Sequence, residues 1–141
     1  MSETSLPSTL SIPDDVLARL TDESVIWLTT VNGHGGPVPT PVWFLWSDAA
    51  FLVFSQPGTS KLTNIAARPR VALNLEADRG GGHVAVFTGT AAIGESVRDD
   101  EWARYTRKYE AGMRSLGVTP EAFRADYSVP IRVTPRRFRG W

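Results

Sequence analysis

Residues 54–76 read FSQPGTSKLTNIAARPRVALNLE, a stretch in which one apolar run ends and another begins. Between the runs, a Pro-Gly pair predicts a turn, GTSKLTNIAAR predicts a short helix, and a second proline ends it. Thr59, Ser60 and Lys61 lie where this helix begins. Free backbone N–H groups, two hydroxyls and one lysine can together bind a phosphate group. The alternative is an ordinary helix cap beside a solvated lysine, and the residues alone favour it, because no P-loop glycine pattern is present.

Composition excludes several classes of protein. The chain has 141 residues, 15 basic and 15 acidic side chains, and no cysteine. Balanced charge argues against a dedicated nucleic-acid or membrane-surface protein, and the lack of cysteine excludes disulfides and thiolate metal sites. No apolar run approaches the roughly 20 residues of a membrane helix, and the N-terminus has no signal-peptide pattern. We expect a soluble cytoplasmic protein that binds neither nucleic acid nor membrane.

The order of apolar patterns predicts a mainly β protein with flanking helices. We expect a flexible segment over residues 1–11 and a single domain over 12–141. Short turns join most of the strands, so the sheet should be mainly antiparallel, and closing it into a barrel or half-barrel would remove exposed edges. The predicted helices are 12–23, 58–68, 98–117 and 119–127, and the predicted strands are 24–31, 37–46, 49–55, 70–78, 83–96 and 129–141.

Two segments carry distinctive side chains. The strand 37–46, PVPTPVWFLW, has three prolines spaced by two, which suits an edge strand or a strand that faces a ligand. It is either a shelf for a flat ring or a rigid core strand, and the residues alone favour the core strand. The helix 98–117 has an aromatic and aliphatic stripe at steps of three and four, which indicates core or dimer packing rather than a cofactor site. The stripe consists of Trp102, Tyr105, Tyr109, Met113 and Leu116.

No catalytic set of side chains stands out in the sequence. The two histidines, His34 and His83, have no third ligand grouped near them, so we expect no metal site. No Ser-His-Asp arrangement and no spaced pair of carboxylates is evident. Hydride transfer from a bound cofactor needs positioning and electrostatics rather than a protein nucleophile, and this chemistry is compatible with such a chain.

Four segments together resemble a known family. PVPTPVWFLW, the stretch 54–76, VFTGTA and the terminal RRFRGW are similar to the split β-barrel flavin and deazaflavin oxidoreductases, a superfamily that includes pyridoxamine 5′-phosphate oxidase. The greatest similarity is to the actinobacterial branch that uses the deazaflavin coenzyme F420. The resemblance covers roughly residues 16–141 and implies a split β-barrel, FMN-binding-like fold and a homodimer with two cofactor sites at the subunit interface.

The resemblance also implies which residues bind the cofactor. The phosphate side would consist of Ser55, Gln56, Thr59, Ser60, Lys61 and Asn64. The ring side would consist of Pro39, Thr40, Pro41, Val42 and Trp43. The terminal RRFRGW, with Arg137 and Trp141, either reaches the partner's site to bind an anionic tail or is a solvated strand end, and the two readings have equal weight.

The resemblance implies an F420-dependent oxidoreductase that transfers hydride between the deazaflavin and a small conjugated or aromatic substrate. The chain lacks the second arginine/lysine pattern expected for tightly held FMN and a phosphorylated vitamin substrate. An FMN-binding oxidoreductase of the same fold is the first alternative. A non-catalytic carrier of F420 or of an apolar ligand is the second.

Overall fold

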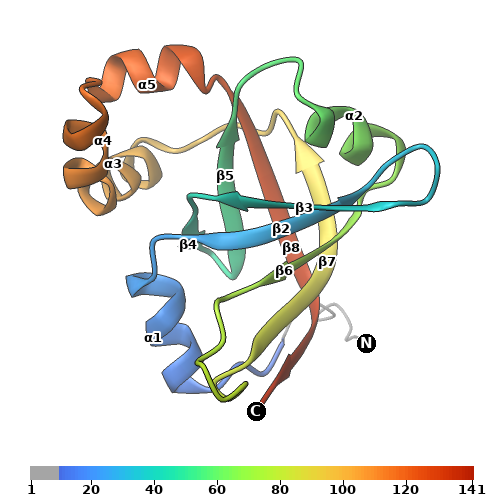
Figure 1. Cartoon of the computed structure of the whole chain (residues 1–141). Coiled ribbons are helices and arrows are strands. Elements are labelled where there is room, and N and C mark those ends of the chain that lie inside the picture. The colour runs from blue at the N-terminus through green and yellow to red at the C-terminus, as the bar shows by residue number, and fades with distance from the viewer. Residues whose placement is uncertain (1–9) are drawn as a thin grey trace, which may run out of the picture.

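The computed structural model describes residues 10–141 and contains one curled sheet with five helices (Figure 1). The predicted flexible segment 1–11 lies mostly outside the described residues. The helices are α1 (Asp14–Asp22), α2 (Ser60–Ala67), α3 (Asp99–Lys108), α4 (Glu110–Leu116) and α5 (Pro120–Asp126). The strands are β2 (Ile26–Val31), β3 (Pro37–Val42), β4 (Leu45–Ser47), β5 (Ala50–Ser55), β6 (Arg70–Asn74), β7 (Ala85–Ile93) and β8 (Val129–Gly140).

The sheet has the strand order β3-β2-β6-β7-β8-β5-β4, and every pairing is antiparallel. Its two edge strands, β3 and β4, are consecutive in the chain and are joined by only Trp43 and Phe44. The sheet must therefore curl until its edges come close together, which gives a half-barrel. The proline-rich β3 pairs only with β2, so the prediction of an edge strand is confirmed.

The core has two parts because β5 is covered on both faces. Phe51 and Val53 point into the curled sheet, where they pack with Ile26 and Leu28 of β2. The alternate residues Leu52 and Phe54 instead belong to a second cluster, formed with side chains of α3, α4 and α5. In Figure 1 these three helices gather beside β5, whereas α1 and α2 lie at other ends of the sheet.

A buried carboxylate joins the helical layer to the sheet. Glu101 of α3 is fully buried and accepts two hydrogen bonds from Arg132 of β8, at 2.6 and 2.9 Å. It also accepts hydrogen bonds from the Ser47 hydroxyl at 2.8 Å and from the Arg98 backbone N–H at 3.0 Å. These donors, with Arg132 as the largest cause, lower the pKa of Glu101 to about 2.

Two predicted elements are divided in the structure. The predicted strand 37–46 breaks at Trp43 and Phe44, because the chain crosses there from one edge of the sheet to the other. The hairpin turn that follows consists of Asp48 and Ala49, both with positive φ, rather than Ser47 and Asp48.

The predicted helix 98–117 is two helices that meet at Tyr109, whose φ of −107° and ψ of 16° interrupt the helical path. The change in direction keeps Tyr109 and Met113 within the second cluster and leaves Leu116 65% exposed. The expectation of core packing therefore holds for Tyr105, Tyr109 and Met113.

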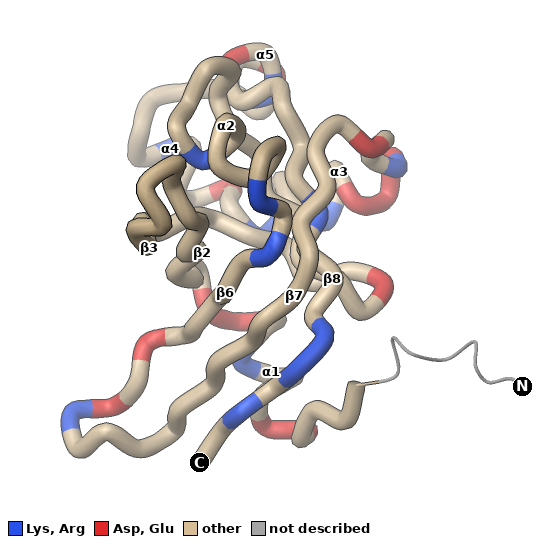
Figure 2. The backbone as a smooth tube through the Cα atoms, turned by 90° about the vertical axis from the view of Figure 1, so that its right-hand side faces the viewer, with Lys and Arg blue, Asp and Glu red and all other residues tan. Residues whose placement is uncertain are grey.

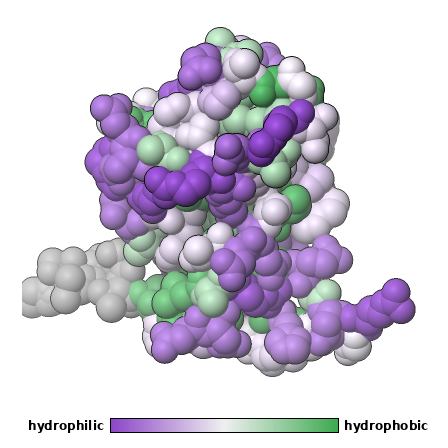
Figure 3. Space-filling model, turned by 90° about the vertical axis from the view of Figure 1, so that its left-hand side faces the viewer, coloured by the Kyte–Doolittle hydropathy of each residue, from purple (hydrophilic) through white to green (hydrophobic). Residues whose placement is uncertain are grey.

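None of the helices within residues 10–141 combines the length and the apolar character needed to cross a membrane. The side of the molecule shown in Figure 3 is mostly hydrophilic, and its hydrophobic residues form separate small groups.

Candidate functional site

A pocket of about 480 Å³ opens between the edge strand β3, the start of α2 and the helical layer. Six of the predicted cofactor-binding residues line it: Thr40, Pro41, Val42, Trp43, Gln56 and Lys61. The structure thus brings part of the predicted ring side and part of the predicted phosphate side to one cavity. Five further residues complete the lining: Phe54, Tyr105, Leu116, Phe123 and Tyr127.

Aromatic rings form one wall of the pocket. The Trp43 ring is stacked between the rings of Tyr109 and Phe123. The Trp43 and Tyr109 centroids are 4.4 Å apart and their planes differ by 5°. The Trp43 and Phe123 centroids are 5.7 Å apart and their planes differ by 17°. Phe123 in turn stacks on Tyr127 at 4.5 Å. A Cβ on Gly112 would lie 3.1 Å from the Trp43 ring, so glycine lets the indole rest against α4. The exposed parts of these stacked rings give the pocket an apolar wall against which a planar ligand can pack.

Hydrogen bonds hold the Trp43-Phe44 crossing in place. The Tyr109 hydroxyl accepts a hydrogen bond from the Phe44 N–H at 2.8 Å and donates one to the Ser24 carbonyl at 2.7 Å. The Lys108 ammonium donates to the Phe44 carbonyl at 2.9 Å and lies 3.8 Å from the centre of the Phe44 ring. Both backbone groups of Phe44 are therefore bonded, so the neighbouring Trp43 has a defined position.

Lys61 is the cation that lines this pocket. Its side chain is half-buried, and burial lowers its pKa from the ordinary value. Within residues 10–141 no hydrogen bond or ion pair involves its ammonium group, and no carboxylate lines the cavity. A half-buried cation without a partner among the described residues is suited to bind an anionic group of a ligand.

The turn before α2 does not form an ordinary side-chain cap. Thr59 is the N-cap residue, yet its hydroxyl makes no capping hydrogen bond and instead lies 3.0 Å from the Ser55 hydroxyl. Ser55 also donates to the Gln56 carbonyl at 2.8 Å, while Gly58 has a φ of 75°. The first N–H groups of α2 are thus not satisfied by Thr59.

The remaining predicted residues lie elsewhere. Asn64 is buried and donates to the Thr30 hydroxyl at 3.0 Å, so its amide supports the contact between α2 and β2. Pro39 and Ser60 are exposed and do not line the pocket. Arg137 lines a different groove, and Trp141 is 69% exposed, with its backbone paired to Val84.

The two histidines lie outside the pocket. His83 is in the β6–β7 loop, where its Nδ1 lies 2.8 Å from Asp78 Oδ2. His34 is in the β2–β3 turn, where its backbone N–H bonds to the Asn32 side chain. Within the described part of the chain, no group of three His, Cys, Asp or Glu side chains is placed to hold a metal ion.

A family model described as pyridoxamine 5′-phosphate oxidase matches residues 12–141. The chain belongs to the pyridoxamine 5′-phosphate oxidase family. The expected superfamily and the expected split-barrel fold are thus confirmed. The match begins before α1 and ends at the last residue, so it includes every strand of the sheet.

Solved structures with this fold have diverse functions. An F420 reductase is 25% identical, with a TM-score of 0.67, over 91% of this chain and 98% of its own. An FAD-binding protein from Mesorhizobium loti is 20% identical, with a TM-score of 0.63, and the match covers 88% of this chain and 87% of that protein. The heme storage protein HutZ from Vibrio cholerae is 15% identical, with a TM-score of 0.63, and the match covers 86% of this chain and 89% of that protein. No curated protein sequence matches the chain.

Proposed function

We propose that the pocket beside β3 binds the deazaflavin coenzyme F420 and that the protein is an F420-dependent oxidoreductase. The observation that carries this proposal is the position of Lys61, a half-buried cation that lines an aromatic-walled cavity and has no ion pair among residues 10–141. The similarity to an F420 reductase over nearly the whole of both chains supports the choice of cofactor.

The residues of the pocket fit a ligand with a flat ring and a phosphate. The cofactor ring would pack against the exposed edges of Trp43 and Phe123, whose faces are stacked on other aromatic rings, while Lys61 and the first N–H groups of α2 would hold the phosphate. When bound, a reduced deazaflavin supplies a hydride to a small conjugated or aromatic acceptor. The chain itself would position the two reactants and exclude water from the contact.

The proposal includes a homodimer with the cofactor site at the subunit interface and places the protein in the cytoplasm. Two alternative functions are considered. The similar FAD-binding structure supports an FMN-binding oxidoreductase. The similar heme storage structure supports a non-catalytic carrier. Heme binding has less support, because neither histidine lines the pocket.

A cofactor titration tests the proposal. We expect protein purified from a host without F420 to be colourless and to bind added F420 at micromolar or tighter concentration. FMN should bind at least about tenfold more weakly, a gap of roughly 1.4 kcal/mol, and Trp43 fluorescence should report the binding. A yellow preparation that releases FMN on denaturation would favour an FMN-binding oxidoreductase. Binding without turnover of any acceptor by reduced F420 would favour a carrier.

Lys61→Ala tests the phosphate contact. We expect F420 affinity to fall by roughly 1.5–3 kcal/mol, the range for a hydrogen bond to a charged group, and the melting temperature without ligand to stay nearly constant. Arg114→Ala is a matched control, because it removes an exposed cation of α4 that does not line the pocket. Unchanged affinity of the Lys61 variant would mean that this lysine does not contact the cofactor.

The pH dependence of binding gives a second readout for the same lysine. The protonated ammonium binds the phosphate, so affinity should fall as pH rises through the pKa of Lys61. Because burial lowers that pKa, the loss should begin at lower pH than for an exposed lysine. Lys61→Ala should remove this part of the pH dependence.

A further inference from the structure

One buried hydroxyl in the aromatic pocket has no hydrogen-bond partner in the described chain. Tyr105 of α3 lines that pocket, although the residue is only 1% exposed. Within residues 10–141, no hydrogen bond involves its hydroxyl group. Buried polar groups in folded proteins nearly always have a partner, and one that lacks a partner costs stability. The hydroxyl of Tyr105 therefore requires an explanation other than its contribution to folding.

Aromatic rings surround Tyr105 on the protein side. The edge of the ring system of Phe54 meets it at 83°, with centroids 4.8 Å apart, and the Tyr109 centroid is 4.9 Å away. The rings of Trp102 and Phe123 follow at 5.7 and 6.0 Å. Three of these four neighbours carry no acceptor oxygen in their side chains. The cavity is thus the side from which a polar partner can reach the hydroxyl.

Tyr109, one helical turn further on, has a hydroxyl with a structural role. It accepts a hydrogen bond from the Phe44 N–H at 2.8 Å and donates one to the Ser24 carbonyl at 2.7 Å. Both tyrosine rings belong to the second core cluster. The packing of the ring therefore explains why position 105 is aromatic, but it does not explain why the ring carries an oxygen.

The surroundings of Tyr105 favour an uncharged partner. Burial raises the pKa of its phenol far above the ordinary value, and Tyr109 and Tyr127 add to this effect. The hydroxyl therefore stays protonated and can act as a donor. The same apolar surroundings would penalise a negatively charged ligand atom at this position. A carbonyl oxygen is an uncharged acceptor that fits both conditions.

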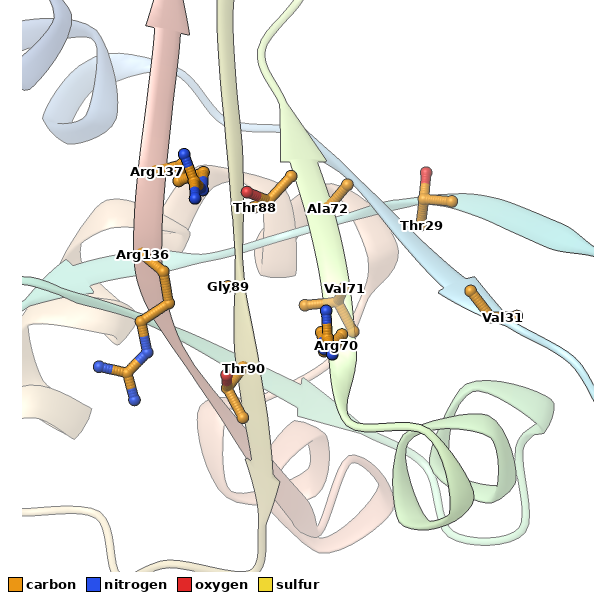
Figure 4. Close-up of a pocket in the computed structure, with 10 residues that line it drawn as sticks. All are labelled: Thr29, Val31, Arg70, Val71, Ala72, Thr88, Gly89, Thr90, Arg136 and Arg137. Carbon is orange, nitrogen blue, oxygen red and sulfur yellow. The ribbon is translucent and has the colours of Figure 1, made fainter. Parts of the chain in front are cut away.

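A second cavity of the molecule has a different character. It has a volume of about 590 Å³ and is lined by residues of β2, β6, β7 and β8 (Figure 4). None of the aromatic residues in the described chain lines it, and its polar side chains are those of arginines and threonines. Figure 2 shows basic segments along the C-terminal half of β8. The two cavities share no lining residue, so apolar rings and a buried neutral donor occur together in the aromatic pocket.

We propose that the Tyr105 hydroxyl donates a hydrogen bond to an uncharged carbonyl oxygen of a planar ligand and makes the pocket select ligands that carry one. A site built to bond a polar group rejects the analogue that lacks it, because the protein group is then left unpaired. The carbonyl can belong to the ring of a flavin-type cofactor or to the acceptor substrate. The second case rests on the proposed function, whereas the hydrogen bond itself does not.

A matched pair of small ligands tests this selectivity on the complete protein. 1-Indanone is a planar aromatic ketone, and indane has the same two rings without the oxygen. In NMR titrations observed on the ligand, we expect Tyr105→Phe to weaken 1-indanone binding at least about fivefold. Indane binding should change less than twofold. Calorimetry of the same variant with F420 shows whether the cofactor ring supplies the oxygen instead.

Stability without ligand gives a readout that a structural role would move in the opposite direction. Tyr105→Phe keeps the ring and removes a buried donor that has no partner, so its melting temperature should stay within about 1 °C of the parent or rise. Tyr109→Phe leaves the Phe44 N–H without an acceptor, and its melting temperature should fall by at least about 3 °C. A fall of that size in the Tyr105 variant would overturn the proposal, because the hydroxyl would then be bonded within the protein.

Two further hydroxyl deletions are controls for the binding experiments. Thr90→Val acts in the cavity of Figure 4 and should change each affinity less than twofold. Tyr127→Phe removes the phenol of a more exposed residue that also lines the aromatic pocket, so its effect should be smaller than that of Tyr105→Phe.

The outcomes separate this inference from the proposed function. A loss confined to 1-indanone would assign the oxygen to the acceptor substrate, and a loss confined to F420 would assign it to the cofactor ring. Selective loss of 1-indanone in a protein that does not bind F420 would support Tyr105 while contradicting the proposed cofactor. The inference is wrong if neither ligand binds saturably to the parent protein, if Tyr105→Phe weakens neither, or if Tyr127→Phe causes an equal loss.

Discussion

Glu101→Gln should lower the free energy of unfolding by about 3–5 kcal/mol, the usual cost of removing one partner from a buried ion pair. The carboxylate is fully buried and accepts four hydrogen bonds, two of them from Arg132. The variant amide keeps the shape but leaves the Arg132 guanidinium, whose side chain is 16% exposed, with only the exposed Glu95 carboxylate, 3.9 Å away, as a counter-charge. Thermal unfolding should therefore shift down by roughly 10–17 °C for a chain of this length.

The same carboxylate should make stability depend on pH in the acid range. Because the folded pKa of Glu101 is lowered from 4.5 to about 2, its contribution is complete above about pH 4.5 and is lost as pH falls toward 2. Glu101→Gln should flatten this part of the stability profile. Glu110→Gln is the control, because this exposed carboxylate of α4 makes no ion pair among residues 10–141. A loss below 1 kcal/mol in the Glu101 variant would contradict the assigned role.

The strands could be predicted from the sequence because each leaves a local pattern of alternation bounded by turn residues. Proline spacing in 37–41 also indicated an edge strand correctly. The break at Trp43 and Phe44 leaves no such pattern, since both residues suit a strand. It follows from topology: β3 and β4 lie at opposite edges, and only the complete sheet determines that the chain must cross there.

The candidate site could be predicted in part for a similar reason. Its β3 and α2 side was implied by the resemblance of two contiguous segments to a known family, whereas the residues alone favoured a capped helix and a core strand; six of the implied residues line one pocket. Its other side comes from α3, α4 and α5, where the periodic stripe predicted burial without indicating what the stripe would face. Tyr105 and Leu116 belong to that stripe and line the pocket, whereas Phe123 and Tyr127 gave no signal beyond their apolar character.

Trp43→Ala should lower the free energy of unfolding by about 3 kcal/mol and remove one wall of the aromatic pocket. The indole is stacked between Tyr109 and Phe123 and lies against α4 at Gly112, so truncation leaves a void where four segments meet. Loss of the two stacked pairs contributes to this cost beyond the buried area. Trp141→Ala is the matched control, since that ring is 69% exposed and its removal should cost less than about 0.5 kcal/mol.

Trp43→Phe separates the structural role of this ring from its role in binding. Phenylalanine keeps an aromatic face between Tyr109 and Phe123, so most of the stability should return in denaturant unfolding, while the fluorescence reporter is removed. If the pocket holds the cofactor ring, F420 should still bind to this variant, measured by calorimetry, but should quench the remaining tryptophans far less than in the parent protein. Undiminished quenching would place the cofactor ring elsewhere.

The stability prediction for Trp43→Ala has its own contradicting outcome. A variant as stable as the parent protein would show that the aromatic stack does not hold the β3–β4 crossing. The wall of the pocket would then be held by Tyr109 alone, through its hydrogen bonds to Phe44 and Ser24.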